Sequence, residues 1–257
     1  MNTSEKVSIP TQDDKNIYAI HARPEEQLMD SIDKTLVLLM HGFPGDIDAH
    51  NAILESIESK ITTKNYHCLR FNFRGCGDSD GRQEDFSLAT AREDIEHVIE
   101  WARAKKYEKF IFISEGLGCA FALMNAPEET LCHVMLWPMI DLPMIAKRNF
   151  KSDKIEEQWK KAGYALIDKS RIGISLIEQL DSTTVESQLQ SLDKPILIMH
   201  GSLDKRSPIE QLEMVREHVK SPRIEITSFQ DGEHGLHQNN HRKPMHFHID
   251  QFIEKYV

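Results

Sequence analysis

The segment from Phe110 to Ala122 constrains the fold of this chain more than any other. It reads FIFISEGLGCAFA, which combines an apolar run of strand length, a turn of small residues and the start of a helix. A G-x-S-x-G sequence at such a strand–turn–helix junction presents a serine nucleophile. The middle position of that pattern is Gly116, which has no side-chain hydroxyl. The segment therefore predicts a sharp turn between a buried strand and a helix, without the attacking atom.

Two further apolar runs end in turns that carry polar groups. Residues 35–40 form a run of buried-strand length, and the sequence HGFPG follows at residues 41–45. A turn of that kind can direct backbone N–H groups toward a substrate oxygen. Residues 195–200 form another such run, and Gly-Ser-Leu-Asp follows it. This spacing places the carboxylate of Asp204 just beyond the C-terminal end of a strand.

A histidine follows the last strand-like run. Residues 223–229 alternate between apolar and polar side chains and lead into DGEHG, which places His234 on the next loop. The order along the chain is the Gly116 turn, then Asp204, then His234. Because the carboxyl ends of parallel strands meet at the same edge of a sheet, we expect Asp204 and His234 to form a hydrogen bond beside the Gly116 turn.

These segments and their order resemble the α/β-hydrolase superfamily, most closely its small esterase and serine-aminopeptidase-like branch. Residues 70–81, RFNFRGCGDSDG, are similar to the sequence that follows the fourth strand in that branch, and the resemblance extends from about Val7 to the C-terminus. It implies an α/β fold with a mainly parallel sheet flanked by helices. It also implies a single domain over residues 1–257 and an acyl hydrolase of the carboxylic-ester type.

The resemblance assigns a role to each residue of the expected site. His234 corresponds to the catalytic histidine, Asp204 to its acid and Gly116 to the nucleophile position, and the backbone amides of Phe43 and Leu117 correspond to the oxyanion hole. Glycine at the turn removes a backbone strain on the order of 1–3 kcal/mol that a residue with a Cβ would carry there. The resemblance therefore implies a stable site in which hydrolysis is absent or very weak.

Three neighbours of Gly116 carry reactive groups. Ser114 lies at the strand end and Cys119 in the first helical turn, both displaced from the apex of the turn, so we expect structural roles for them. We assign Glu115 no catalytic role, because a carboxylate beside such a turn is more often solvated or hydrogen-bonded. A water that His234 activates in place of the missing hydroxyl would give only feeble catalysis.

Residues 141–191 break the alternation of strands and helices and are predicted to form a small helical cap. An insertion after the strand at residues 133–137 would cover the C-terminal strand ends, where ligands bind in open parallel sheets. We expect it to close a mostly apolar pocket for a small acyl or aromatic ligand. The residues expected to line this pocket are Trp137, Met139, Met144 and Trp159. The alternative is a solvated helical excursion with no ligand role.

Composition and charge exclude several classes of function. The net charge of −10 and the lack of a basic stripe argue against nucleic acid as a partner. No signal-like leader and no apolar run of about 18 residues is found, so we expect a cytoplasmic protein without a membrane partner. Four cysteines without C-x-x-C spacing are expected to be reduced, and no cofactor is expected. The oligomeric state stays open.

The C-terminal region is rich in histidine. Its last helix is predicted to begin near Pro244, which suits a first helical turn. His237 and His241 have the i, i+4 spacing of two metal ligands on one helix face, but no helix is expected across Asn239 and Asn240. We therefore expect no metal, and we expect the histidines of this region other than His234 to be exposed.

Two hypotheses about function follow. The first is an ester or amide hydrolase whose serine has been replaced by Gly116. If Asp204 and His234 had no use, we would expect other residues to have replaced them. The second is a non-catalytic relative, a pseudoenzyme, that binds a small ligand or a protein partner in the capped pocket.

Overall fold

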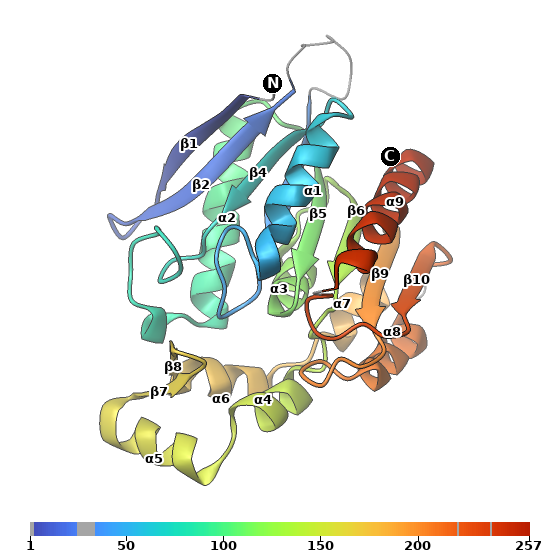
Figure 1. Cartoon of the computed structure of the whole chain (residues 1–257). Helices are drawn as coiled ribbons and strands as arrows, with labels where there is room; N and C mark the ends of the chain where they lie inside the picture. The colour runs from blue at the N-terminus through green and yellow to red at the C-terminus, as the bar shows by residue number, and fades with distance from the viewer. Residues whose placement is uncertain (1–2, 25–33, 220, 237) are drawn as a thin grey trace.

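The computed structural model describes residues 3–24, 34–219, 221–236 and 238–257. Eight strands form one sheet in the order β1-β2-β4-β3-β5-β6-β9-β10 (Figure 1). These strands are β1 (Thr3–Pro10), β2 (Asn16–Arg23), β3 (Thr35–Met40), β4 (His67–Phe71), β5 (Lys109–Glu115), β6 (Thr130–Leu136), β9 (Ile196–Gly201) and β10 (Ile224–Phe229).

The sheet is mainly parallel, which confirms the predicted fold class. Strands β4, β3, β5, β6, β9 and β10 pair in parallel. At one edge, β1 pairs antiparallel with β2, and β2 pairs antiparallel with β4. All residues of β3 and β9 are buried. This burial on both faces explains why these strands are continuous apolar runs rather than alternating ones.

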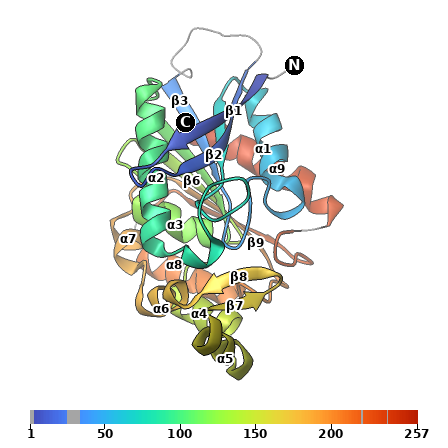
Figure 2. The same ribbon diagram turned by 90° about the vertical axis from the view of Figure 1, so that its left-hand side faces the viewer.

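Helices cover both faces of the sheet and connect its strands. They are α1 (Ile53–Thr62), α2 (Leu88–Ala104), α3 (Leu117–Asn125), α8 (Leu212–His218) and α9 (Asn239–Tyr256), with short 3-10 turns η2 (His50–Ala52), η3 (Gln83–Asp85) and η4 (Ile209–Gln211). One apolar core lies between the sheet and helices α1 and α9, and the other includes α2, α3 and α8. Figures 1 and 2 show these helices on opposite faces.

The cap lies between β6 and β9 and covers one end of the sheet (Figures 1 and 2). It consists of α4 (Leu142–Phe150), α5 (Asp153–Ala162), β7 (Tyr164–Ile167), β8 (Ser170–Gly173), α6 (Ile174–Ser182) and α7 (Glu186–Ser191). The cap is thus not purely helical as predicted, because β7 and β8 form an antiparallel hairpin. Its two turn residues, Asp168 and Lys169, both have positive φ angles, as a two-residue type I′ hairpin turn requires.

The start of the last helix differs from the prediction. Helix α9 begins at Asn239, so the expectation of no helix across Asn239 and Asn240 is wrong, and Pro244 lies inside the helix. One face of α9 is an apolar stripe, in which Met245, Ile249 and Phe252 are buried in the core beside α1. The free energy gained by burying this stripe offsets the loss of the backbone hydrogen bond that Pro244 cannot donate.

The histidines of this region are not all exposed as predicted. His241 is buried, and its Nε2 lies 2.8 Å from Oδ1 of Asp231. His246 is half-buried, and its Nε2 lies 2.9 Å from Oγ of Ser56 on α1. His237 lies outside the described residues. Across the part of the chain that the structure describes, no helix combines the length and the apolar character needed to span a membrane.

Candidate active site

Gly116 forms the apex of a sharp turn between β5 and α3. Its φ of 54° and ψ of −125° lie in a region that side chains with a Cβ rarely adopt. Its amide donates to the Leu136 carbonyl at 3.1 Å, and its carbonyl accepts from the Met139 amide at 3.0 Å. A Cβ built on Gly116 would have only the Gly42 Cα, at 3.9 Å, as a near neighbour. The turn therefore has room for a side chain, and hydrogen bonds hold both the N–H and the C=O of Gly116.

The loop at residues 41–45 lies against this turn. A Cβ on Gly42 would be 3.1 Å from the Glu115 carbonyl oxygen and 3.3 Å from the Leu117 amide nitrogen, which is tighter than most such contacts, so glycine favours this close approach. Leu117 is the first residue of α3, and its N–H has no partner within the helix. Among the described residues the Phe43 amide donates to no protein acceptor. Two backbone donors are thus available beside Gly116, where the resemblance implies an oxyanion hole.

His41 fixes the conformation of the loop. Its Nδ1 donates to the Gly42 carbonyl at 2.6 Å, while its Nε2 accepts from the Phe73 amide at 3.1 Å. Complete burial lowers the pKa of His41, so the ring is neutral and keeps these two opposite roles. The buried imidazole therefore connects the 41–45 loop to the segment that follows β4.

The expected contact between Asp204 and His234 is confirmed. Nδ1 of His234 donates to Oδ2 of Asp204 at 2.8 Å, because a carboxylate only accepts. The other oxygen, Oδ1, accepts from the amides of Arg206 and Ser207, each at 2.9 Å. Burial raises the pKa of Asp204. The hydrogen bond and charge of His234 and the Ser207 amide lower it by more, so the net shift of the pKa is downward. Asp204 is thus held as an anion that fixes the His234 tautomer.

Glu115 is hydrogen-bonded, which is one of the two environments expected for it, but its complete burial was not predicted. It is completely buried, and three donors surround its carboxylate. Oε1 accepts from the Gly42 amide at 2.8 Å, and Oε2 accepts from Nδ1 of His50 at 2.9 Å and from Nε1 of Trp137 at 2.7 Å. Burial opposes ionisation, but the bond to His50, the charge of His50 and the other two donors lower the pKa of Glu115 to about 2.

His50 connects this carboxylate to the predicted histidine. Its ring lies edge-on to that of His234, with the centroids 5.4 Å apart, and the Trp137 ring lies 6.4 Å from His234. The hydrogen bond to Glu115 raises the pKa of His50. Because Glu115 immediately precedes Gly116, these contacts place His234 beside the turn. No sequence signal pointed to His50, since it lies far from Glu115 along the chain.

The two alternative nucleophiles are both inaccessible. Ser114 is fully buried in β5. Cys119 is fully buried as well, and its Sγ lies 3.2 Å from the Ser114 carbonyl oxygen. Burial raises the pKa of the Cys119 thiol well above its usual value, so the thiolate that would attack a substrate does not form.

A cavity of about 240 Å³ opens beside the turn, between the 41–45 loop, the cap and the loop after β9. Its wall consists of Phe43, Pro44, Met139, Arg148, Asn149, Phe150, Ile167, Asp168 and Arg206. Met139 connects the cavity to the turn through its bond to Gly116. Five of these nine residues are apolar, and the other four are charged or polar.

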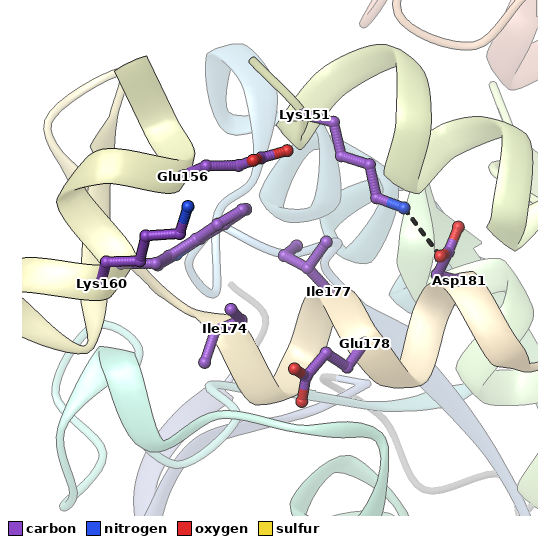
Figure 3. A pocket seen from close by; sticks show the side chains of 8 residues that line it. Lys151, Glu156, Lys160, Ile174, Ile177, Glu178 and Asp181 are labelled. Atoms are coloured by element: carbon purple, nitrogen blue, oxygen red, sulfur yellow. Dashed lines mark hydrogen bonds and ion pairs between the residues drawn. The ribbon is translucent and has the colours of Figure 1, made fainter. Parts of the chain in front are cut away.

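Of the four residues expected to line a pocket here, only Met139 does. Trp137 is buried on the other face of the sheet, and Met144 lines a separate surface hollow beside α8. Trp159 belongs to a cavity of about 200 Å³ inside the cap, between α5 and α6, which Figure 3 shows. Its Nε1 donates to the Ile172 carbonyl at 2.8 Å, so its role is to join α5 to β8.

Metal ligands do not cluster in the described ranges. No group of three or more histidine, cysteine, aspartate or glutamate side chains there could hold a metal ion. The described cysteines Cys68, Cys76, Cys119 and Cys132 are all buried and free.

A known family model and several known proteins match parts of the chain. A family model described as the alpha/beta hydrolase fold matches residues 35–130. An uncharacterized 31.7 kDa protein of Escherichia coli is 33% identical over 76 residues, which are 30% of this chain and only 26% of that protein. Human mitochondrial palmitoyl-protein thioesterase ABHD10 is 20% identical over 210 residues, 78% of this chain and 67% of that protein.

Solved structures share the fold over nearly the whole chain. The esterase Est1E from Butyrivibrio proteoclasticus, solved with ferulic acid, superposes with a TM-score of 0.82 at 19% identity, covering 97% of this chain and 98% of its own. Mouse alpha/beta hydrolase domain-containing protein 10 superposes with a TM-score of 0.78 at 15% identity, covering 98% and 100%. The partial family match and the shared architecture together show that this chain has the α/β-hydrolase fold.

Proposed function

We propose that the site is of the carboxylic-ester hydrolase type and that Gly116 leaves it without a nucleophile. One observation carries the proposal. Gly116 has the positive φ angle and the anchored turn that suit a nucleophile, and His234, hydrogen-bonded to Asp204, lies beside that turn. The similarity to proteins named as esterases and as a thioesterase supports an acyl carbonyl as the group that is attacked.

The proposed chemistry assigns one step to each group. His234 accepts a proton from the attacking oxygen, Asp204 stabilises the resulting imidazolium, and the amides of Phe43 and Leu117 hold the oxyanion. Because position 116 has no hydroxyl, the attacking oxygen must come from water, and no acyl-enzyme forms there. We therefore infer that the protein with Gly116 hydrolyses esters very slowly or not at all.

A second candidate function is non-catalytic binding of a small ligand. Two observations favour it: Gly116 provides no nucleophile, and the buried Ser114 and Cys119 cannot replace one. A cavity beside an intact set of polar groups can still bind an ester or a carboxylic acid. In this proposal the site recognises its ligand and does not turn it over.

Restoring the hydroxyl tests the proposal. Gly116→Ser is expected to hydrolyse 4-nitrophenyl acetate and butyrate at least about 10³-fold faster than Gly116→Ala, because both variants add a Cβ and only one adds a nucleophile. The alanine variant controls for the strained backbone. If Gly116→Ser folds but is no faster than Gly116→Ala, the hydrolase proposal is wrong and the binding function takes its place.

A further inference from the structure

The cavity beside Gly116 has one apolar side and one charged side. Phe43 and Phe150 are buried, and with Pro44, Met139 and Ile167 they supply the apolar side. The charged side comes from the C-terminal end of α4, the hairpin turn of the cap and the loop after Asp204. At about 240 Å³ the cavity is smaller than a typical drug-sized pocket, so it suits a ligand with a short acyl or single-ring body.

Two guanidinium groups stand at the mouth of this cavity. Arg148 donates through Nε to the Lys205 carbonyl at 2.7 Å, and Asn149 donates to the Arg206 carbonyl at 2.9 Å. These bonds fasten the end of α4 to the loop that also supplies an amide to Asp204. The position of both arginines relative to the site is therefore set by the fold and not only by side-chain rotamers.

The charges at the mouth do not cancel. Arg206 pairs with Asp168 at 2.7 Å. Arg148 has no carboxylate partner among the described residues, and its two terminal nitrogens are left to bind a ligand. Among the residues that line the cavity, the two arginines and the single aspartate therefore sum to one positive charge.

The two carboxylates deeper in the site are both ionised, but hydrogen-bond donors surround each of them. The Glu115 carboxylate is surrounded by His50, Trp137 and the Gly42 amide, and that of Asp204 by His234 and two amides. The charge of Arg206 acts on His50 and opposes its protonation, so the mouth and the centre of the site lie within electrostatic range of each other.

We propose that this cavity recognises esters whose acyl or aryl body carries a carboxylate at the end remote from the scissile bond, with Arg148 and Arg206 as the residues that bind the carboxylate. The inference rests on the proposed function, since it places the ester carbonyl beside Gly116. A guanidinium group binds a carboxylate through two parallel hydrogen bonds. One net positive charge matches a carboxylate monoanion better than a phosphate dianion, which Asp168 would repel.

The test is a binding measurement on the full chain with two ligands of equal shape. Calorimetric titration compares methyl 4-carboxybenzoate with methyl 4-carbamoylbenzoate, in which a neutral amide replaces the carboxylate. We expect the carboxylate ester to bind about 10-fold more tightly, because hydrogen bonds to charged groups are the stronger ones. Phenyl phosphate serves as the competing anion and is expected to bind more weakly.

Single substitutions assign the preference to the cavity. Arg148→Gln and Arg206→Gln are each expected to remove most of the preference for the carboxylate ester. Arg216→Gln, on the exposed side of α8 and outside the cavity, is the matched control and is expected to keep it. Equal binding of the two esters, a preference that survives both cavity substitutions, or tighter binding of phenyl phosphate would each overturn the proposal.

Turnover by Gly116→Ser separates this inference from the proposed function. If that variant hydrolyses both esters at equal rates, hydrolysis stands and the recognition of charge is wrong. If it hydrolyses neither ester while the unsubstituted protein still prefers the carboxylate, the hydrolase function is wrong and the binding site stands.

Discussion

Nδ1 of His50 lies 2.9 Å from Oε2 of Glu115, the residue immediately before Gly116. The other oxygen of the same carboxylate holds the Gly42 amide at 2.8 Å. His50 in turn lies against the ring of His234. One buried carboxylate thus connects the 41–45 loop, the Gly116 turn and the predicted general base.

Loss of the Glu115 charge is expected to destabilise the protein. Glu115→Gln should lower the free energy of unfolding by about 3 kcal/mol, because it leaves His50 beside a neutral amide in a buried site. Glu108→Gln removes an exposed ion pair with Lys34 and should cost less than about 1 kcal/mol. Urea unfolding of both variants provides the measurement. Equal losses would contradict the structural role of Glu115.

The same pair predicts how stability depends on pH. Folding lowers the Glu115 pKa from 4.5 to about 2, so its contribution is present above pH 4.5 and is lost as the pH falls toward 2. Folding raises the His50 pKa above 6.5, so its contribution is complete below pH 6.5 and is lost as the pH rises through the folded value. The difference in unfolding free energy between the protein and Glu115→Gln should therefore be largest between pH 4.5 and 6.5. A difference that is constant with pH would contradict the pairing.

The close approach of α3 to the 41–45 loop depends on glycine. A Cβ on Gly118 would lie 2.6 Å from the His41 carbonyl oxygen, so Gly118→Ala should cost about 3 kcal/mol of stability through overpacking against backbone. Gly163→Ala is the control, because that Cβ meets nothing within 4 Å. Its positive φ alone should cost about 1 kcal/mol. Thermal unfolding compares the two, and a milder effect at Gly118 would be inconsistent with this packing.

The carboxylate of Asp204 is expected to matter only once a nucleophile is present. In the Gly116→Ser variant, Asp204→Asn should slow ester hydrolysis by about 10⁴-fold, because an amide can stabilise the wrong tautomer of His234. Asp231→Asn alters a carboxylate–histidine pair of the same 2.8 Å length, with His241, and should leave the rate nearly unchanged. The measurement is the rate of 4-nitrophenyl butyrate hydrolysis by the two asparagine variants. Equal effects of Asp204→Asn and Asp231→Asn would argue against a base role for His234.

Much of the fold follows from local sequence patterns. The apolar runs that became β3, β5, β6 and β9 are buried on both faces, and such strands are recognisable without any tertiary information. The contact between Asp204 and His234 was predictable for the same reason, because each follows a strand of one parallel sheet. Turns that need glycine, such as that at Gly116, mark the strand ends clearly.

The remaining features depend on contacts between distant segments. The sequence does not show whether Glu115 is solvated or buried, because its burial depends on His50 and Trp137. Neither of these residues is near Glu115 in the sequence. The cap hairpin escaped prediction because β7 and β8 have four residues each and Asp168-Lys169 is not the glycine-containing turn that type I′ geometry favours. The pocket residues were misplaced because Trp159 packs within the cap rather than over the sheet.

Covalent labelling at position 116 tests the central claim most directly. The Gly116→Ser and Gly116→Ala variants are incubated with a serine-directed fluorophosphonate, and the intact mass of each chain is measured. We expect one phosphonyl adduct on the Gly116→Ser chain, located by peptide mapping to the turn between β5 and α3, and none on the Gly116→Ala chain. A folded Gly116→Ser variant that remains unlabelled would show that His234, Asp204 and the amides of Phe43 and Leu117 do not form an activating site around this turn.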